Sequence, residues 1–367
     1  MSQKVNWDYL KQLKDPYLFL KAYFIKNNKS SKSNKILIVD PCLIGDFIVS
    51  LPAINTFIKS NKNSEIDLIV TPPLKNLAGR IKGIRKVFVA KSSTSRSIEK
   101  TDSKTEISEK YDKIVIMRLS DESFNLIKNL NCNEISVPLS KYLKYQIVYP
   151  IRDTILKRQP IQRREIDFEI LKQKPREVSF EEIFNFNEKD YQKIKKLEAM
   201  KTKDKIIIIH TGPAWIMRVW ENNKWAELIK KINTLGKFRF VFVGTEEADK
   251  DFKEISKNLD FKVYSLIGKL DIENLMLVLR KSYYLIGVDS GPRNMAHLAD
   301  LRSITLFGPA ASGAIYMPWD KKDIVIDKSN GGGLYQAFFY KKKKFIDKIT
   351  ADEVYKSFKR LMKQSRD

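Results

Sequence analysis

The sequence predicts an α/β fold of two domains, each built on a parallel sheet, from three observations. At 367 residues the chain is longer than one hydrophobic core usually serves. Apolar runs alternate with segments of helical periodicity in both halves, which is typical of open α/β sheets. The clearest unit lies at residues 283–309, where an apolar run, 283–288, leads through a tight turn and a helix to a second run, 304–307.

The first half begins its strands at residues 35–40, KILIVD, an apolar run typical of a buried strand. After the turn at 41–46, apolar residues at helical spacing predict a helix, with Phe47, Ile48, Leu51, Ile54 and Ile58 on its inner face. Further strands are predicted at 66–70, 86–90 and 113–117. The polar segment 91–109 is interpreted as an exposed insertion.

The second half begins with residues 205–210, KIIIIH, whose four consecutive isoleucines predict a strand buried on both faces. Later strands are predicted at 238–243, 262–265, 283–288 and 304–307, and helices at 222–235 and 271–280, the latter capped by Asp271. In the helix after residue 290, Met295, Leu298 and Leu301 share a face. A last helix, 349–362, has Thr350 as its cap and Val354, Phe358 and Leu361 facing inward.

The domain boundaries follow from where this rhythm of strands and helices begins and stops. Residues 140–200 lose it and become rich in charge, so they are interpreted as helices and an interdomain connection. The predicted parts are an N-terminal helical extension (1–34), a first domain (35–175), a connection (176–200), a second domain (201–348) and a C-terminal helix (349–367).

The net charge of +24 and the pI near 9.7 raise nucleic acid or an anionic membrane surface as partners. Much of the excess is lysine scattered along predicted helices, which a solvated surface explains equally well. There is no zinc-finger spacing, ribonucleoprotein motif or basic zipper. No nucleic-acid partner is therefore expected.

The cysteines and the N-terminus bear on the compartment. Cys42 and Cys132 form no CxxC motif and no metal-ligand spacing, which suits a reducing environment. The first residues are charged throughout and lack an apolar run of signal-peptide or membrane-span length, so a cytoplasmic protein is expected. Residues 5–27 predict an amphipathic helix, which either packs on the first domain or lies on an anionic bilayer.

Three turns of the second half follow strand ends and carry groups suited to a nucleotide. The turn 289–294 opens a helix whose N-terminal amides, after Asp289, Ser290 and Gly291, suit a diphosphate. In the turn after residue 210, Arg218 offers a charged fork for phosphate. After Gly244, Glu246 can accept hydrogen bonds from both ribose hydroxyls.

Asp46 stands at the start of the first predicted helix and has two interpretations. It is either a helix N-cap or a carboxylate at the sheet edge that accepts a proton from a hydroxyl. The two histidines, His210 and His297, have no matched Glu or Cys, so no metal site is predicted. His210 is interpreted as holding a loop by a hydrogen bond, and His297 as either a buried, satisfied residue or a ligand contact.

Two common nucleotide-binding signatures are absent from the sequence. There is no GxGxxG after a first strand and no GxxxxGK[ST], which argues against a Rossmann dehydrogenase or a P-loop enzyme. No organic cofactor is therefore expected.

Five segments, in order, resemble glycosyltransferase family 9, the bacterial heptosyltransferases of lipopolysaccharide core synthesis. The first, KILIVDPCLIGDFIVSLPAINTFIK, resembles that family's strand, Gly-Asp pair and Leu-Pro-Ala helix. The second, HTGPAWIMRVWENNKWAELI, resembles its His-x-Gly loop with a basic residue two before Trp. The others are VFVGTEE, LIGKLDIENL and GVDSGPRNMAHLADLRSITLFGP, so the resemblance covers about residues 35–315.

The resemblance implies a GT-B architecture, in which two Rossmann-like domains face each other across a cleft with the donor on the C-terminal one and the acceptor on the N-terminal one. It implies no metal and a nucleotide-diphosphate sugar donor, ADP-heptose being favoured. Asp46, preceded by Gly45, takes the place of the general base; Arg218 that of the phosphate contact; Glu246 that of the ribose contact. The implied donor site comprises Thr211, Gly212, Arg218, Gly244, Glu246, Lys269, Asp289, Ser290, Gly291, Arg293 and Asn294.

One position departs from the family pattern, which usually has His three residues after the Gly of the last turn. Here that residue is Asn294, and Arg293 beside it can supply the charge. The sequence thus predicts an inverting, metal-independent glycosyltransferase acting on a lipid-linked or phosphorylated glycan at the inner membrane. The alternatives are a nucleotide-sugar-binding protein without transfer activity, or a transferase with another sugar or a protein acceptor.

Overall fold

The computed structural model describes residues 34–90, 107–118, 123, 126–127, 130, 132–136, 163–212, 219–307, 322–328 and 345–364. They divide into two compact units. The first contains the described residues up to 136 together with Arg164–Val178, and the second contains Arg163 and the residues from Ser179 onward. The predicted N-terminal extension, apart from its last residue, Asn34, lies outside the described residues together with its amphipathic helix. None of the helices in the described ranges is long and apolar enough to cross a membrane.

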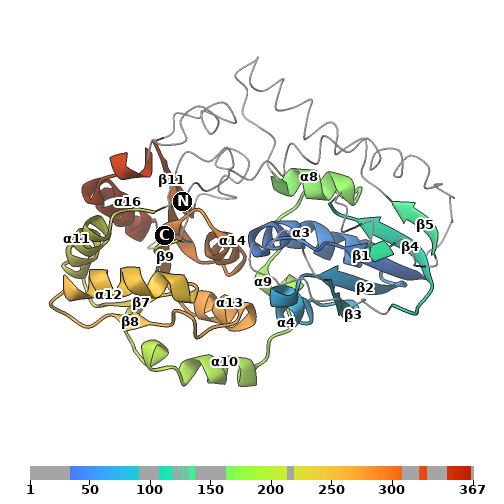
Figure 1. Ribbon diagram of the computed structural model, residues 1–367, viewed down its shortest axis with the longest axis horizontal. Coiled ribbons are helices and arrows are strands. Elements are labelled where there is room, and N and C mark those ends of the chain that lie inside the picture. Colours follow the sequence, from blue (N-terminus) through green and yellow to red (C-terminus); the bar gives the residue numbers. More distant parts are fainter. Residues whose placement is uncertain are drawn as a thin grey trace, which may run out of the picture. The chain divides into compact units, whose positions relative to one another are not determined.

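The first unit is built on a five-stranded parallel sheet (Figure 1). Its strands are β1 (Lys35–Val39), β2 (Glu65–Val70), β3 (Ile84–Val89), β4 (Tyr111–Ile116) and β5 (Cys132–Ser136), in the spatial order β3-β2-β1-β4-β5. The chain runs outward from β1 to β3 and then returns to the centre at β4. The loops that follow β1 and β4 therefore diverge, which is where open α/β sheets bind ligands.

Helix α3 (Ile44–Ser60) follows β1 and buries the predicted apolar face against the sheet. Its N-cap is Leu43, which makes no side-chain cap hydrogen bond, and Asp46 is the third residue of the helix. The interpretation of Asp46 as an N-cap is therefore wrong. The helix starts at Ile44, three residues before Phe47, which is the first residue of the predicted apolar face. Ile44 and Gly45 have helical geometry but are not buried.

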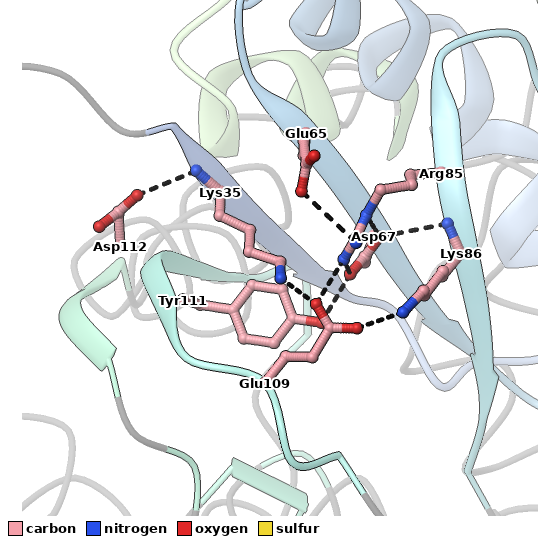
Figure 2. A network of polar contacts seen from close by, with 8 residues as sticks. All are labelled: Lys35, Glu65, Asp67, Arg85, Lys86, Glu109, Tyr111 and Asp112. Atoms are coloured by element: carbon pink, nitrogen blue, oxygen red, sulfur yellow. Dashed lines mark hydrogen bonds and ion pairs between the residues drawn. The ribbon is translucent and has the colours of Figure 1, made fainter.

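The amino ends of the first-unit strands carry a closed network of ion pairs (Figure 2). The buried carboxylate of Asp67 accepts hydrogen bonds from Arg85 (Nε, 2.9 Å; Nη2, 2.5 Å), from the hydroxyl of Tyr111 (2.7 Å) and from the amide of Lys86 (3.1 Å). Burial and this hydrogen bond raise the pKa of Tyr111. Because these donors occupy the Asp67 carboxylate, the network is a structural anchor.

The interpretation of residues 91–109 as an exposed insertion is wrong for its last residue, Glu109. Its carboxylate pairs with Lys35, Lys86 and Arg85, and only 20% of its side chain is exposed (Figure 2). Hydrogen bonds from these three cations hold the pKa of Glu109 well below its usual range. Residues 91–106 lie outside the described part; the end of the segment is tied by charge to two strands, β1 and β3.

The residues interpreted as a connection, 176–200, begin in the first unit and continue as helices of the second. Capping boxes start α9 (Phe180–Ile183) at Ser179 and α10 (Glu188–Lys195) at Asn187. Helix α10 contacts α13 (Ile272–Arg280), as Figure 1 shows. Helix α8 (Arg163–Ile170), by contrast, leads into the residues that close the first unit.

The second unit has a six-stranded parallel sheet (Figure 1). Its strands are β6 (Lys205–His210), β7 (Phe238–Phe242), β8 (Tyr264–Ser265), β9 (Tyr284–Val288), β10 (Arg302–Phe307) and β11 (Asp323–Asp327), in the order β11-β10-β9-β6-β7-β8. The helices that accompany them, besides α13, are α11 (Asn222–Asn233), α12 (Asp249–Lys257), α14 (Gly291–Leu298) and α16 (Ala351–Lys363). The prediction of two parallel α/β sheets is confirmed.

The C-terminal helix α16 packs on the second unit, beside α11 (Figure 1). Phe358 contacts the rings of Phe238 and Tyr284 at centroid distances of 5.8 and 5.0 Å. The indole nitrogen of Trp220 donates to the carbonyl of Ile349 (2.9 Å) just before the helix, and Thr350 caps it. The predicted inward face of α16 is therefore confirmed.

Candidate active site

Strands β6, β7, β8 and β9 all end at the carboxyl edge of the second sheet, where the turn after each of them begins. They do so because all four strands are parallel and adjacent in the sheet, so their carboxyl ends share one side. The order places β6 next to β9, and the chain leaves these two strands in opposite directions. This is the switch point at which ligands bind in such sheets.

Two of these turns are joined through glycines. The amide of Gly268, after β8, donates to the carbonyl of Gly244, after β7 (3.0 Å). Gly268 has φ of 68°, and a Cβ there would lie 2.8 Å from Cγ of Glu246. Glu246 therefore lies directly over the Gly268 backbone, with an exposed carboxylate at the sheet edge. Lys269, also exposed, donates to the carbonyl of Ser265 (3.3 Å).

We expect Gly268→Ala to displace Glu246 and to weaken nucleotide binding about tenfold, because the methyl group needs the space that the Glu246 side chain occupies. The positive φ should also cost about 1 kcal/mol of unfolding free energy. Calorimetric titration with ADP and denaturant unfolding measure the two effects. Gly236→Ala is the matched control, since a Cβ there meets only the Phe238 ring at 3.6 Å. Unchanged affinity for ADP in Gly268→Ala would contradict the expected role of Glu246.

His210 ends β6 with its side chain buried at the same edge. Its Nδ1 lies 3.1 Å from the carbonyl oxygen of Val243, which requires the proton on Nδ1 and leaves Nε2 as an acceptor. Nε2 has no hydrogen-bond partner within the described ranges. Burial lowers the pKa of His210, and the bond to Val243 opposes this only in part. The structure thus shows the hydrogen bond expected of His210.

The lowered pKa of His210 predicts a loss of stability in mild acid. At pH values just below the ordinary pKa of about 6.5, His210 is protonated in the unfolded chain but stays neutral in the folded chain. The free energy of unfolding should fall by up to about 1.4 kcal/mol per pH unit from this residue. His210→Asn keeps a donor for Val243 and should flatten this dependence. Denaturant unfolding at about pH 7.5 and about pH 5.5 compares the proteins; identical pH dependence in both would contradict the assignment.

The turn after β9 leads straight into α14. Its N-cap, Ser290, is extended and makes no side-chain cap hydrogen bond; its hydroxyl donates instead to the carbonyl of Val288 (3.3 Å). Asp289 is buried, whereas Ser290 and Gly291 are partly exposed. The first turn of α14 therefore presents its amides to an anion without a side-chain cap in front of them.

Arg293 lies inside the second unit and not at its surface. Only 3% of it is exposed; one guanidinium nitrogen donates to Oδ1 of Asn294 (3.0 Å), and the group lies 5.6 Å from the Phe307 ring centre. Burial lowers the pKa of Arg293, against the opposing charges of Asp289 and Asp323. Its Nη2 has no hydrogen-bond partner in the described part of the chain. Any charge that Arg293 gives a ligand acts from within the fold.

The remaining predicted donor residues fall into three groups. His297 is largely buried, and its Nδ1 lies 3.3 Å from Oδ2 of Asp323; the other oxygen of that carboxylate, Oδ1, accepts from the Ser303 hydroxyl (2.6 Å). Thr211 is buried and Gly212, with φ of 114°, is partly exposed at the end of β6. Arg218 lies outside the described residues.

The carboxyl edge of the first sheet holds Asp46 beside residues that the sequence analysis did not single out. Arg118, two residues after β4, forms an ion pair with buried Asp40 and donates to the carbonyl of Asp46 (3.0 Å). Asp167 of α8 lies 3.9 Å from the same guanidinium. In the sequence, Asp40 and Arg118 each follow an apolar run, and those two runs form the adjacent strands β1 and β4.

Across the ranges that the structure describes, no group of three or more His, Cys, Asp or Glu side chains could hold a metal ion.

Residues 163–333 match the sequence model described as glycosyltransferase family 9 (heptosyltransferase). These residues include all four turns at the carboxyl edge of the second sheet. The resemblance to glycosyltransferase family 9 is confirmed. The family 9 match does not extend to Asp46, which lies in the first unit.

One curated relative is lipopolysaccharide heptosyltransferase 3 of Escherichia coli (strain K12), 26% identical over 176 residues, which are 46% of this chain and 49% of the relative. The chain thus spans about half the length of this family 9 relative. Among solved structures, a family 9 glycosyltransferase from Veillonella parvula aligns with a TM-score of 0.68 and 14% identity, over 92% of this chain and 100% of the other.

A further solved structure is E. coli heptosyltransferase WaaC with ADP-2-deoxy-2-fluoro heptose, with a TM-score of 0.60 and 15% identity, over 89% of this chain and 99% of the other. At these identities the two structures show the fold. The predicted GT-B fold class, with two Rossmann-like parallel-sheet domains, is confirmed.

Proposed function

We propose that this protein is an inverting glycosyltransferase that transfers a heptosyl group from ADP-heptose to a lipopolysaccharide-core or related glycan. The observation that carries the proposal is that the family 9 match contains the turns after β6 to β9, which begin at one sheet edge. The donor is favoured because a heptosyltransferase of the same fold was solved with an ADP-heptose analogue.

The second unit supplies the donor site in this proposal. Glu246 accepts hydrogen bonds from the ribose hydroxyls, since its carboxylate is exposed at the sheet edge beside Gly268. The first amides of α14, after Ser290 and Gly291, receive the diphosphate. Arg218 and Lys269 add positive charge, and Thr211, Gly212 and Asn294 complete the pocket. The leaving diphosphate thus loses its excess charge to backbone amides and cations, so the proposed reaction is metal-independent.

Asp46 is the general base in this proposal. It takes the proton of the acceptor hydroxyl as the oxygen forms a bond to the anomeric carbon, while the bond from that carbon to the diphosphate oxygen breaks. A single displacement of this kind inverts the anomeric configuration. Asp46 suits the role because it is partly exposed in the first turn of α3, at the switch point of its sheet.

Transfer assays test the proposal. Purified protein is incubated with a heptose-deficient lipopolysaccharide core and either ADP-heptose, UDP-glucose or UDP-N-acetylglucosamine, and products are identified by mass spectrometry. We expect product with ADP-heptose alone. Product with another donor only would reject heptose, and no product with any donor would reject transfer to this acceptor.

A nucleotide-sugar-binding protein without transfer activity is the second candidate. It is favoured by Asn294, which stands where family 9 usually has His and donates without carrying a charge. Tight calorimetric binding of ADP-heptose, with no product on lipid, glycan or protein acceptors, would support this function over the first.

The acceptor proposal includes a peripheral position on the cytoplasmic face of the inner membrane. The net charge of +24 favours an anionic leaflet that carries a lipid-linked acceptor. Co-sedimentation with phosphatidylglycerol vesicles, and none with phosphatidylcholine vesicles, is expected.

A further inference from the structure

Arg118 joins three elements of the first unit around the first turn of α3. It lies two residues after the end of β4, and the residue between, Met117, is fixed against β1 because its amide donates to the carbonyl of Val39 (3.0 Å). From there its guanidinium pairs with Asp40 after β1 and donates to the carbonyl of Asp46 in α3 (3.0 Å). Only 18% of the Arg118 side chain is exposed.

Asp40 extends this connection into the helix. The hydroxyl of Ser50, one turn beyond Asp46, donates to Oδ2 of Asp40 (2.9 Å), and Asp40 is fully buried. The N-cap of α3, Leu43, makes no side-chain cap hydrogen bond. The contacts of Arg118 and Asp40 therefore hold the first turn of α3, and with it Asp46, in place of a capping side chain.

Arg118 lies among acidic groups. The groups that face it are Asp40 after β1, Cys42 from the loop, Asp46 from α3 and Asp167 from α8. Burial acts to lower the pKa of Arg118, but the charges of the three aspartates outweigh it and raise the pKa well above its ordinary value. Burial, with Asp40 and Asp46 nearby, raises the pKa of Cys42, so its thiol stays neutral. Two of these carboxylates, those of Asp40 and Asp167, are fully buried.

We propose that Arg118 is a positioning residue for Asp46: it fixes the first turn of α3 through the Asp46 carbonyl and cancels the charge of Asp40 beside the base. This inference rests on the proposed function, in which Asp46 takes the acceptor proton. Without Arg118, the Asp46 carbonyl loses this hydrogen bond and the charge of Asp40 loses this cation beside the proposed base.

The test compares transfer rates across pH for Arg118→Met, Arg118→Lys and the double variant Arg118→Met with Asp40→Asn. In Arg118→Met we expect kcat to fall at least about tenfold near pH 6 and the acid limb of its pH profile to move up by about one unit, with KM for the donor unchanged. Arg118→Lys should restore part of the rate. The double variant removes both charges and should return the acid limb toward its original position.

Arg85→Met is the matched control, since Arg85 is also a partly buried arginine that pairs with a fully buried aspartate, at the opposite edge of the same sheet. It should lower stability and leave the pH profile unmoved. An unmoved acid limb in Arg118→Met, or the same shift in Arg85→Met, overturns the positioning role while transfer by the unmodified protein still supports the proposed function.

Two further outcomes are an inactive unmodified protein and an Arg118→Met variant that does not fold. If the unmodified protein transfers no sugar, the proposed function and the role of Arg118 fall together. If Arg118→Met does not fold, the double variant decides: a low rate with a normal acid limb and normal donor affinity supports the positioning role, and a normal rate overturns it.

Discussion

Asp46→Asn is expected to lower kcat by about 10²–10⁴-fold, the usual contribution of a general base. The substitution keeps the shape and the place of the side chain in the first turn of α3, and it removes the ability to take a proton. Donor affinity should stay within about twofold, because the proposed donor contacts all lie in the second unit. Single-turnover transfer and calorimetric binding of ADP measure the two quantities separately.

Asp112→Asn is the matched control for this experiment. Asp112 is a carboxylate of the same unit, placed at the amino end of β4, where it accepts from the amides of Asn34 and Lys35 (both 3.0 Å). Its substitution should leave kcat within about twofold, since the residue lies far along the strands from the carboxyl edge. A near-normal kcat in Asp46→Asn would remove Asp46 from the mechanism and leave the donor site intact.

The buried strands could be predicted from the sequence because both faces of a parallel strand are covered. Runs such as KILIV and the four isoleucines of β6 have no other favourable environment, and the structure buries them. The caps at Asp271 and Thr350 were equally clear, since each side chain accepts from the amide three residues on. These features depend on local chemistry.

Strands β5 and β11 and helix α12 were missed where local chemistry is ambiguous. Strand β5, CNEIS, lies at an edge of its sheet and carries polar residues, so the sequence shows no apolar run there. Strand β11, DIVID, is the edge strand next to β10, and two aspartates flank its short apolar run. Helix α12 buries little apolar surface, Ile255 being its one buried residue, and its charged sequence resembles a loop.

The sites divide in the same way between local and distant chemistry. Turns at strand ends can be read from the sequence, and parallel pairing brings Gly244, Glu246 and Gly268 together. Contacts between distant side chains cannot be read in that way. The pairing of Arg118 with Asp40 joins residues 78 positions apart, and it depends on β1 lying beside β4, which no local pattern specifies.

The same reasoning predicts a large effect at the opposite edge of the first sheet. Asp67→Asn should lower the free energy of unfolding by about 3 kcal/mol, the lower end of the cost of breaking a buried ion pair. We expect the lower end of this range because 29% of the Arg85 side chain is exposed, so water can partly replace the lost carboxylate. The variant leaves an amide NH₂ facing Arg85 and weakens the acceptor of the buried Tyr111 hydroxyl. Denaturant unfolding of the whole chain measures the change.

Two further variants separate the contributions to this network. Tyr111→Phe removes one hydrogen bond to a charged acceptor and should cost about 1.5 kcal/mol. Glu65→Gln is the matched surface control: Glu65 also pairs with Arg85 (3.4 Å) but is 58% exposed, so its loss should cost under about 1 kcal/mol. Equal costs for Asp67→Asn and Glu65→Gln would show that burial adds nothing to this ion pair. Asp67→Asn should cost more than Glu65→Gln because water can replace the exposed Glu65 carboxylate beside Arg85 but cannot reach the buried site of Asp67.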